Sequence, residues 1–118
     1  MKNLETKTVS FKEANGEATF DLNLQAAVKA ASVLRAVNHP LRQRILGLID
    51  SKKGITVTEI YCALKVEQSV ASMHLSILRG SEIVSTEREG KLIHYHLNEQ
   101  KIKEVDRYSS LLAFKQTK

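Results

Sequence analysis

Two short helix-forming segments with a tight break between them constrain the fold of this chain more than any other feature. Thr56-x-x-Glu59 is a capping box, in which the Glu59 amide donates to the threonine hydroxyl and the Thr56 amide donates to the glutamate side chain. It predicts a short helix over about 56–64. About three residues, 65–67, separate this helix from a second one within Val66–Arg79. Such spacing is typical of a helix-turn-helix.

The second helix of this pair has a core-facing side and an unusual outer side. At about 100° per residue, Ala71, Leu75 and Leu78 fall within a narrow arc and are expected in the core. The opposite side carries Ser69, Ser72, Met73 and Ser76, flanked by Gln68 and Arg79. Solvent-facing helices usually carry Glu and Lys there, and each serine costs some tenths of a kcal/mol relative to alanine. Small uncharged side chains instead favour an approach to base edges in the major groove of DNA, which is about 12 Å wide.

Three further helices are expected around this pair. Apolar residues recur at helical spacing over 21–37. Pro40 suits the first position of another helix, and Gly54 is placed to end or follow it. The tail, 99–118, has the pattern of a final helix.

A β-hairpin is expected between the helix-turn-helix and the final helix. One strand-like run begins at Ile83, and a second includes 92–97, which is rich in β-forming residues. Glu89-Gly90 lies between the two runs, with Arg88 and Lys91 on either side, so the hairpin has a charged tip. The sequence therefore predicts a mainly α fold with a small β-hairpin, a winged helix-turn-helix with an added helix at each end.

The first twenty residues are harder to interpret. The stretch "TVSFKEANGEATFDL" alternates weakly on both sides of Asn15-Gly16, and Asn-Gly is the strongest two-residue hairpin signal. An isolated hairpin is marginal in water, so a mobile arm is the open alternative. We expect an N-terminal arm or short hairpin over 1–20 and a winged-helix domain over 21–118.

Composition and charge narrow the class of protein. Hydrophobic residues make up 42% and charged residues 26%, which fits one globular domain with short extensions. No apolar run approaches the ~20 residues that cross a bilayer, and the N-terminus has no apolar signal core. A single cysteine excludes an internal disulfide and agrees with the cytoplasm. Residues 1–28 carry a net charge of −1 and residues 29–118 a net charge of +6, which favours a polyanionic partner for the second part.

Three stretches resemble the ArsR (arsenic-repressor-type) family of bacterial winged-helix regulators. They are "NHPLRQRIL", "TVTEIYCAL" and "QSVASMHLSILRGSEIVSTEREGKLIHYHLN", and the similarity covers roughly residues 30–98. The resemblance implies a cytoplasmic homodimer that represses promoters, with the terminal helices forming the dimer interface. It also implies base contacts from Gln68, Ser69, Ser72 and Met73, with phosphate or minor-groove contacts near Arg88 and Lys91.

We therefore predict a sequence-specific regulator that binds double-stranded DNA, a homodimeric repressor reading a pseudo-palindromic operator. The residues expected to contact DNA are Gln68, Ser69, Ser72, Met73, Ser76, Thr56, Lys65, Arg79, Arg88 and Lys91. The alternative is a winged-helix protein-interaction module that does not bind DNA, which Glu67 and Met73 favour. An enzyme is not expected, because the chain has no Gly-rich phosphate loop, nucleophile motif or convincing carboxylate pair.

Neither a metal nor another cofactor is expected, and the sequence indicates no effector. Cys62 does not match the ligand positions usual in the family and is expected to be a small buried residue, with a reactive thiol as the alternative. His94 and His96 should share one strand face, where they could bind a metal only if further ligands converged. His74 is expected to be packed or hydrogen-bonded, and His39 to begin a helix.

Overall fold

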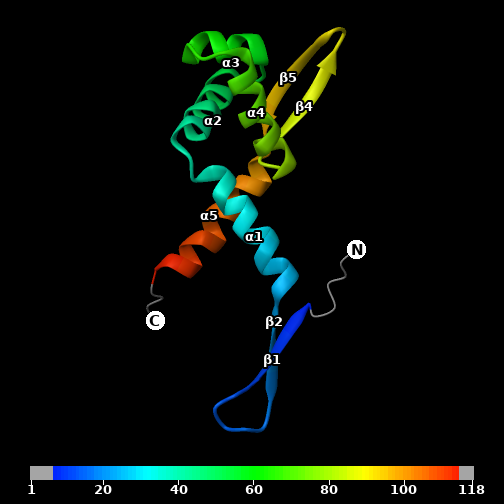
Figure 1. Ribbon diagram of the computed structural model, residues 1–118, viewed down its shortest axis with the longest axis vertical. Helices are drawn as coiled ribbons and strands as arrows, with labels where there is room; N and C mark the ends of the chain where they lie inside the picture. The colour runs from blue at the N-terminus through cyan, green and yellow to red at the C-terminus, as the bar shows by residue number, and fades with distance from the viewer. Residues whose placement is uncertain (1–6, 115–118) are drawn as a thin grey trace. The chain divides into compact units, whose positions relative to one another are not determined.

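The computed structural model describes residues 7–114, whose contacts divide into one unit that ends at Ser32 and a second that begins at Val33 (Figure 1). The elements in chain order are β1 (Thr8–Lys12), β2 (Thr19–Asn23), α1 (Leu24–Val37), α2 (Pro40–Lys52), β3 (Ile55–Thr56), α3 (Val57–Leu64), α4 (Gln68–Gly80), β4 (Val84–Glu89), β5 (Leu92–Leu97) and α5 (Glu99–Ala113). Among the described residues, no helix has the length and apolar character needed to span a membrane. The domain division expected at residue 20 stays a prediction, and residues 1–6 of the expected arm lie outside the described residues.

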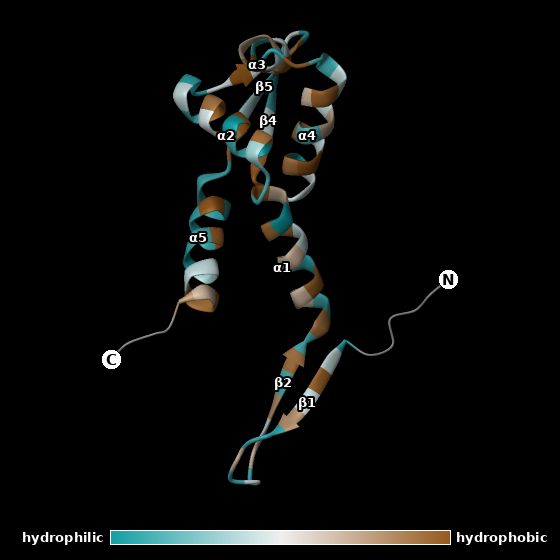
Figure 2. Ribbon diagram, turned by 60° about the vertical axis from the view of Figure 1, so that its left-hand side comes forward, coloured by the Kyte–Doolittle hydropathy of each residue, from teal (hydrophilic) through white to brown (hydrophobic). Residues whose placement is uncertain are grey.

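The first unit contains an antiparallel hairpin that runs directly into a helix. β1 pairs with β2, with Phe11 opposite Phe20, and both strands carry hydrophobic residues (Figure 2). The connecting loop spans 13–18, longer than a two-residue Asn-Gly turn, and Gly16 within it has a φ of 76°. The helix expected from residue 21 begins at Leu24, because residues 21–23 pair with β1. The Asn23 side chain accepts a hydrogen bond from the Ala26 amide at 2.9 Å.

The core of the second unit lies between α2, α3, α4 and a small sheet. Its fully buried large side chains are Ile45, Ile49, Ile55, Ile60, Leu75, Leu78 and Ile83. The predicted capping box is confirmed: the Glu59 amide donates to the Thr56 hydroxyl at 3.3 Å, and the Thr56 amide donates to the Glu59 carboxylate at 3.0 Å. α3 ends at Leu64, and the C-cap residue Lys65 has a left-handed φ of 59° that turns the chain toward α4.

The sheet of this second unit has three strands in the order β3-β5-β4, all antiparallel. β4 and β5 form the expected hairpin, which extends beside α4 as the wing (Figure 1). Tyr95 and Leu97 on β5 pack against the core with Val84 on β4. The intervening residues, His94 and His96, belong to the other face, because successive side chains of a strand alternate.

α5 follows the wing and returns to the core. Asn98 caps this helix by accepting from the Lys101 amide at 3.2 Å, and its own side chain donates to the Glu82 carbonyl at 3.0 Å. Ile102 and Val105 pack against the core cluster. The predicted winged helix-turn-helix with an added helix at each end is therefore confirmed for the described residues.

The expectation that Cys62 is buried is wrong, because its side chain is exposed. α3 buries Ile60 and Leu64, which are four residues apart and share one face. Cys62 lies midway between them, so about 200° of helical rotation places it on the opposite side.

Candidate nucleic-acid interface

The outer side of α4 is an exposed ridge without charge. It consists of Ser69, Ser72, Met73 and Ser76, which are all exposed and which we call the α4 ridge. On the opposite side of the helix, Ala71, Leu75 and Leu78 are at most 1% exposed. The structure therefore confirms the buried and exposed sides of α4 that helical periodicity predicted. Packing of the buried side fixes the direction in which the α4 ridge faces.

Charged and polar groups border the α4 ridge at both ends. Gln68 is the first residue of α4, and Lys65 lies in the turn before it; both are exposed. Arg79 is exposed in the last turn. Glu67 is the N-cap of α4, at the start of the ridge, but its side chain makes no capping hydrogen bond. The local field therefore combines a neutral ridge with cations near its two ends and one acid at its start.

Thr56 is the N-cap of α3, and it makes one more hydrogen bond to Glu59 than the predicted capping box requires. Its hydroxyl accepts from the Glu59 amide and also donates to the Glu59 carboxylate, at 3.3 Å in both cases. The Thr56 amide, by donating to the same carboxylate, holds the pKa of Glu59 below its usual range. The Thr56 hydroxyl therefore uses both its proton and one of its lone pairs in hydrogen bonds to Glu59 of α3. A contact of Thr56 with DNA stays a prediction.

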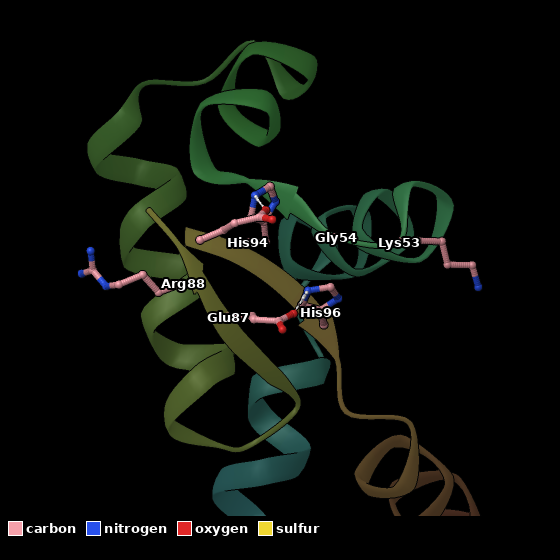
Figure 3. Close-up of a pocket in the computed structure, with 7 residues that line it drawn as sticks. Lys53, Gly54, Glu87, Arg88, His94 and His96 are labelled. Atoms are coloured by element: carbon pink, nitrogen blue, oxygen red, sulfur yellow. Dashed lines mark ion pairs between the residues drawn. The ribbon is translucent and has the colours of Figure 1, made fainter. Parts of the chain in front are cut away.

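The wing tip presents two cations. Arg88 and Lys91 are both exposed, on either side of the turn at Gly90. The guanidinium of Arg88 donates to the Gly90 carbonyl at 3.4 Å. In Figure 3 this side chain points away from His94 and His96, so the cation and the two imidazoles lie on different sides of the wing.

The imidazole side of the wing forms an open hollow of about 480 Å³ (Figure 3). His94 Nε2 lies 3.4 Å from a Glu89 carboxylate oxygen, and His96 Nε2 lies 3.3 Å from a Glu87 oxygen. His94 Nε2 is buried and the Glu89 contact lacks hydrogen-bond geometry. Within residues 7–114, no three His, Cys, Asp or Glu side chains are grouped as a metal would require.

Position 54, beside this hollow, requires glycine for both backbone and steric reasons. Its φ is +108°, a conformation that side-chain-bearing residues rarely adopt. A Cβ at this position would also lie only 2.8 Å from Cε1 of His96. The expectation that Gly54 merely ends or follows α2 was therefore incomplete, since it also leaves room for the His96 ring.

A buried histidine anchors α4 to the preceding helices. His74 is 6% exposed, and its Nδ1 lies 3.1 Å from a guanidinium nitrogen of Arg42. Arg can only donate, so Nδ1 accepts and the proton of the neutral ring is on Nε2. Arg42 also donates to the carbonyls of Ala36 and Arg35, at 2.6 and 3.1 Å. One guanidinium thus joins the end of α1, the start of α2 and the buried side of α4.

His39 completes this corner. Its Nδ1 accepts from the Leu41 amide at 3.1 Å, which makes it the N-cap of α2 and confirms its predicted place at a helix start. Its ring centroid is 4.8 Å from that of His74. Burial lowers the pKa of His74, and the charges of His39 and Arg42 lower it further. The prediction that His74 is packed or hydrogen-bonded is confirmed, since it is both. Arg42 was missed, and the signal available for it was its place in the first turn after Pro40.

These elements define a winged helix-turn-helix nucleic-acid-binding domain, with α4 as the recognition helix and β4–β5 as the wing. Comparison with known proteins gives the family. The sequence model described as "Bacterial regulatory protein, arsR family" matches residues 39–86. The chain belongs to this family, as the resemblance indicated. It is a DNA-binding transcriptional regulator and not an enzyme.

Two relatives illustrate the similarity. The transcriptional repressor PagR of Bacillus anthracis is 33% identical over 75 residues, which are 64% of this chain and 75% of PagR. The transcriptional repressor SdpR of Bacillus subtilis is 35% identical over 68 residues, 57% of this chain and 73% of SdpR. The crystal structure of PagR superimposes with a TM-score of 0.59 at 29% identity, covering 72% of this chain and 97% of the chain in that crystal structure.

Proposed function

We propose that two copies of this chain form a cytoplasmic repressor that binds a pseudo-palindromic site in double-stranded DNA. The observation that carries this proposal is the α4 ridge: an exposed helix side, aimed outward by a buried opposite side, with no charged residue on it. PagR and SdpR, at 33% and 35% identity, are both repressors, which supports the direction of regulation.

The chemistry of the α4 ridge suits the major groove. Short serine side chains let the helix backbone come close to base edges, and their hydroxyls can serve bases or phosphates. Gln68 can pair with N6 and N7 of adenine, since a carboxamide offers one donor and one acceptor. Met73, which is 53% exposed, offers an apolar surface that suits the methyl group of thymine.

Cations at the margins would hold the duplex in register. Lys65 and Arg79 border the α4 ridge, and Arg88 and Lys91 stand at the wing tip. Phosphate contacts of this kind position a protein on DNA without reading its sequence. They also make binding sensitive to salt, because each neutralised phosphate releases a condensed counterion.

The proposed dimer rests on exposed apolar side chains of the C-terminal helix and on an apolar hollow beside it. In α5, Tyr108, Leu111 and Leu112 are 55%, 47% and 81% exposed. An apolar hollow of about 440 Å³ also lies between α2 and α5, lined in part by Leu46 and Val105. A twofold axis through such an interface would present two recognition helices to sites about one helical turn apart, ~10 base pairs or a multiple.

Ser69→Glu tests the proposal directly. This change places a carboxylate on the α4 ridge, where it would face phosphates and base acceptors. We expect affinity for a promoter duplex from the chain's genomic neighbourhood to fall at least about tenfold, the loss typical of one direct base contact. Fluorescence anisotropy across a salt series measures this, and circular dichroism shows that the fold is retained.

The matched control is Gln100→Glu, which makes the same change in net charge at an exposed position in the first turn of α5. We expect it to alter duplex affinity by less than about twofold, because the carboxylate lies at a helix start rather than on the recognition helix. Equal losses in both variants, or equally weak binding to every duplex, would contradict the proposal.

The second candidate is a protein-interaction module, and the exposed Met73 and the acidic Glu67 favour it. The two candidates differ in what covers the α4 ridge. Protection of the ridge from hydrogen exchange by a duplex supports the DNA proposal. Protection that needs a protein partner and no duplex supports the alternative.

A further inference from the structure

The β1–β2 hairpin has one apolar face and one polar face. Val9 lies opposite Leu22 and Phe11 opposite Phe20, so the four large apolar side chains share one side. They are 37%, 46%, 43% and 51% exposed in that order, and the two phenyl rings stack at a centroid distance of 5.4 Å. The other side pairs Thr8 with Asn23, Ser10 with Asp21 and Lys12 with Thr19.

This alternation is typical of a sheet with one covered face. Cross-strand pairs on the apolar side, such as the stacked phenyl rings, stabilise an uncovered hairpin only modestly, whereas covering that side would bury all four side chains. A two-stranded hairpin is also marginal in water unless something packs on its apolar face. The pattern therefore points to a cover that a single copy of the first unit does not supply, since all four side chains remain exposed there.

The hairpin is built as a continuation of α1. No residue separates β2 from α1, and the Leu24 amide donates to the Lys7 carbonyl at 2.7 Å. The hydrogen bond from the Ala26 amide to the Asn23 side chain closes the same junction. Val28, in the next turn of α1, is 66% exposed. An interface that includes the first turns of α1 would be continuous with the hairpin.

The charge of the hairpin separates the possible partners. Residues 7–23 carry two lysines and three acids, a net charge of −1. Nucleic acid and anionic lipid both attract basic segments, so neither matches this surface. The arsR-family match covers 39–86 and leaves the hairpin outside, so the hairpin is an addition to the matched part of the chain. A second copy, already required by the proposed repressor, is the partner that fits.

We propose that the apolar face of the β1–β2 hairpin is buried against a second copy of this chain and extends the dimer interface of the terminal helices. This inference rests on the proposed homodimer. In a twofold dimer the same patch is used by both subunits, so each stabilising contact occurs twice.

Phe11→Thr and Lys12→Thr form a matched pair of tests. Both place threonine in β1, one on the apolar face and one on the polar face, and threonine retains a high β-propensity. Sedimentation equilibrium of the full chain without DNA measures the dimer dissociation constant. We expect Phe11→Thr to raise it at least about tenfold, the effect of losing one well-packed aromatic anchor. Lys12→Thr should change it by less than about twofold.

A tryptophan probe reports burial of the hairpin itself. The chain has no tryptophan, so Phe20→Trp gives a single reporter on the apolar face and Lys12→Trp a matched reporter on the polar face. We expect the emission of Phe20→Trp to shift to shorter wavelength as the concentration passes through the dimerisation midpoint. The emission of Lys12→Trp should stay at the wavelength typical of water.

The outcomes separate this inference from the proposed function. If the chain dimerises and binds its operator while Phe20→Trp emission stays unchanged, the hairpin proposal is overturned and the repressor stands. A shift that occurs only with neutral phosphatidylcholine vesicles also overturns it, in favour of a lipid surface. Absence of any dimer at operator-binding concentrations would instead remove the proposed function on which the inference rests.

Discussion

His74 shows at the scale of one residue how the recognition helix is held in place. Its imidazole accepts from Arg42, and the same guanidinium binds the last carbonyls of α1. A protonated ring would have no lone pair for Arg42 and would bring two cations together in a buried place. The corner is therefore built for a neutral imidazole.

The pH dependence of stability follows from this contact. The pKa of His74 is lowered in the folded chain, by burial first and then by the charges of His39 and Arg42. An unfolded chain titrates its imidazoles near about 6.5, so it binds more protons than the folded chain just below that pH. The stabilisation due to the neutral ring is complete above about pH 6.5 and is lost as pH falls through the lower, folded-state pKa.

His74→Asn isolates that contribution, because the amide oxygen can still accept from Arg42 but does not titrate. Urea unfolding at about pH 7 and about pH 5 measures the loss of unfolding free energy in each protein. We expect the parent chain to lose more than His74→Asn does. His39, His94 and His96 are common to both proteins, so identical losses would show that the His74–Arg42 contact does not carry the dependence.

Sequence reasoning at this scale succeeded where a residue's own helix decided its surroundings. Periodicity placed Ala71 and Leu75 inside and Ser72 outside, as found. It could not find Arg42, because the carbonyls and the imidazole that this side chain binds come from two other helices. The prediction that Cys62 is buried was wrong because it relied on the usual burial of cysteine and ignored the side of α3 on which position 62 falls.

At the scale of elements, two helices end in the same strained way. Lys53 after α2 and Lys65 after α3 have φ values of 55° and 59°, and each amide bonds to a carbonyl of the last turn. A side-chain-bearing residue costs roughly 1–2 kcal/mol in this left-handed conformation, and glycine avoids most of that cost. Lysine at both positions therefore lowers stability.

Lys53→Gly and Lys65→Gly separate the backbone effect from the proposed phosphate contact. Both should raise the free energy of unfolding by about 1 kcal/mol, because both relieve the same strain. Only Lys65→Gly removes a cation beside the α4 ridge, so only this variant should weaken duplex binding and reduce the slope of log affinity against log salt by about 1. Duplex titrations that respond equally to both changes would count against a phosphate contact at Lys65.

The elements themselves were predictable to different degrees. The capping box and the apolar periodicity are local signals, and they located α2, α3 and α4 closely. The start of α1 was missed because residues 21–23 pair with residues 8–10, between eleven and fifteen positions earlier, which a local pattern does not reveal. β3 is only two residues long and exists through its pairing with Tyr95 and His94 of β5, so it has no periodicity of its own.

At the scale of the whole molecule, the proposed function requires two subunits that each present one α4 ridge to the same duplex. The second part of the chain carries the positive charge, +6 over residues 29–118, whereas residues 1–28 carry −1. This division of charge is the one expected if the winged helix binds DNA and the first hairpin packs on another subunit, as we propose. Fold class and family were accessible from the sequence, but the hairpin's apolar face depends on a strand register that only the structure gives.

Hydroxyl-radical footprinting of a promoter duplex from the chain's genomic neighbourhood tests the central claim most directly, namely that two α4 ridges face the same side of one dimer. We predict two protected patches on one face of the duplex, centred about 10 base pairs or a multiple apart. Both patches should disappear together with Ser69→Glu and persist with Gln100→Glu. A single patch, or two that lie on opposite faces of the duplex, would contradict the account.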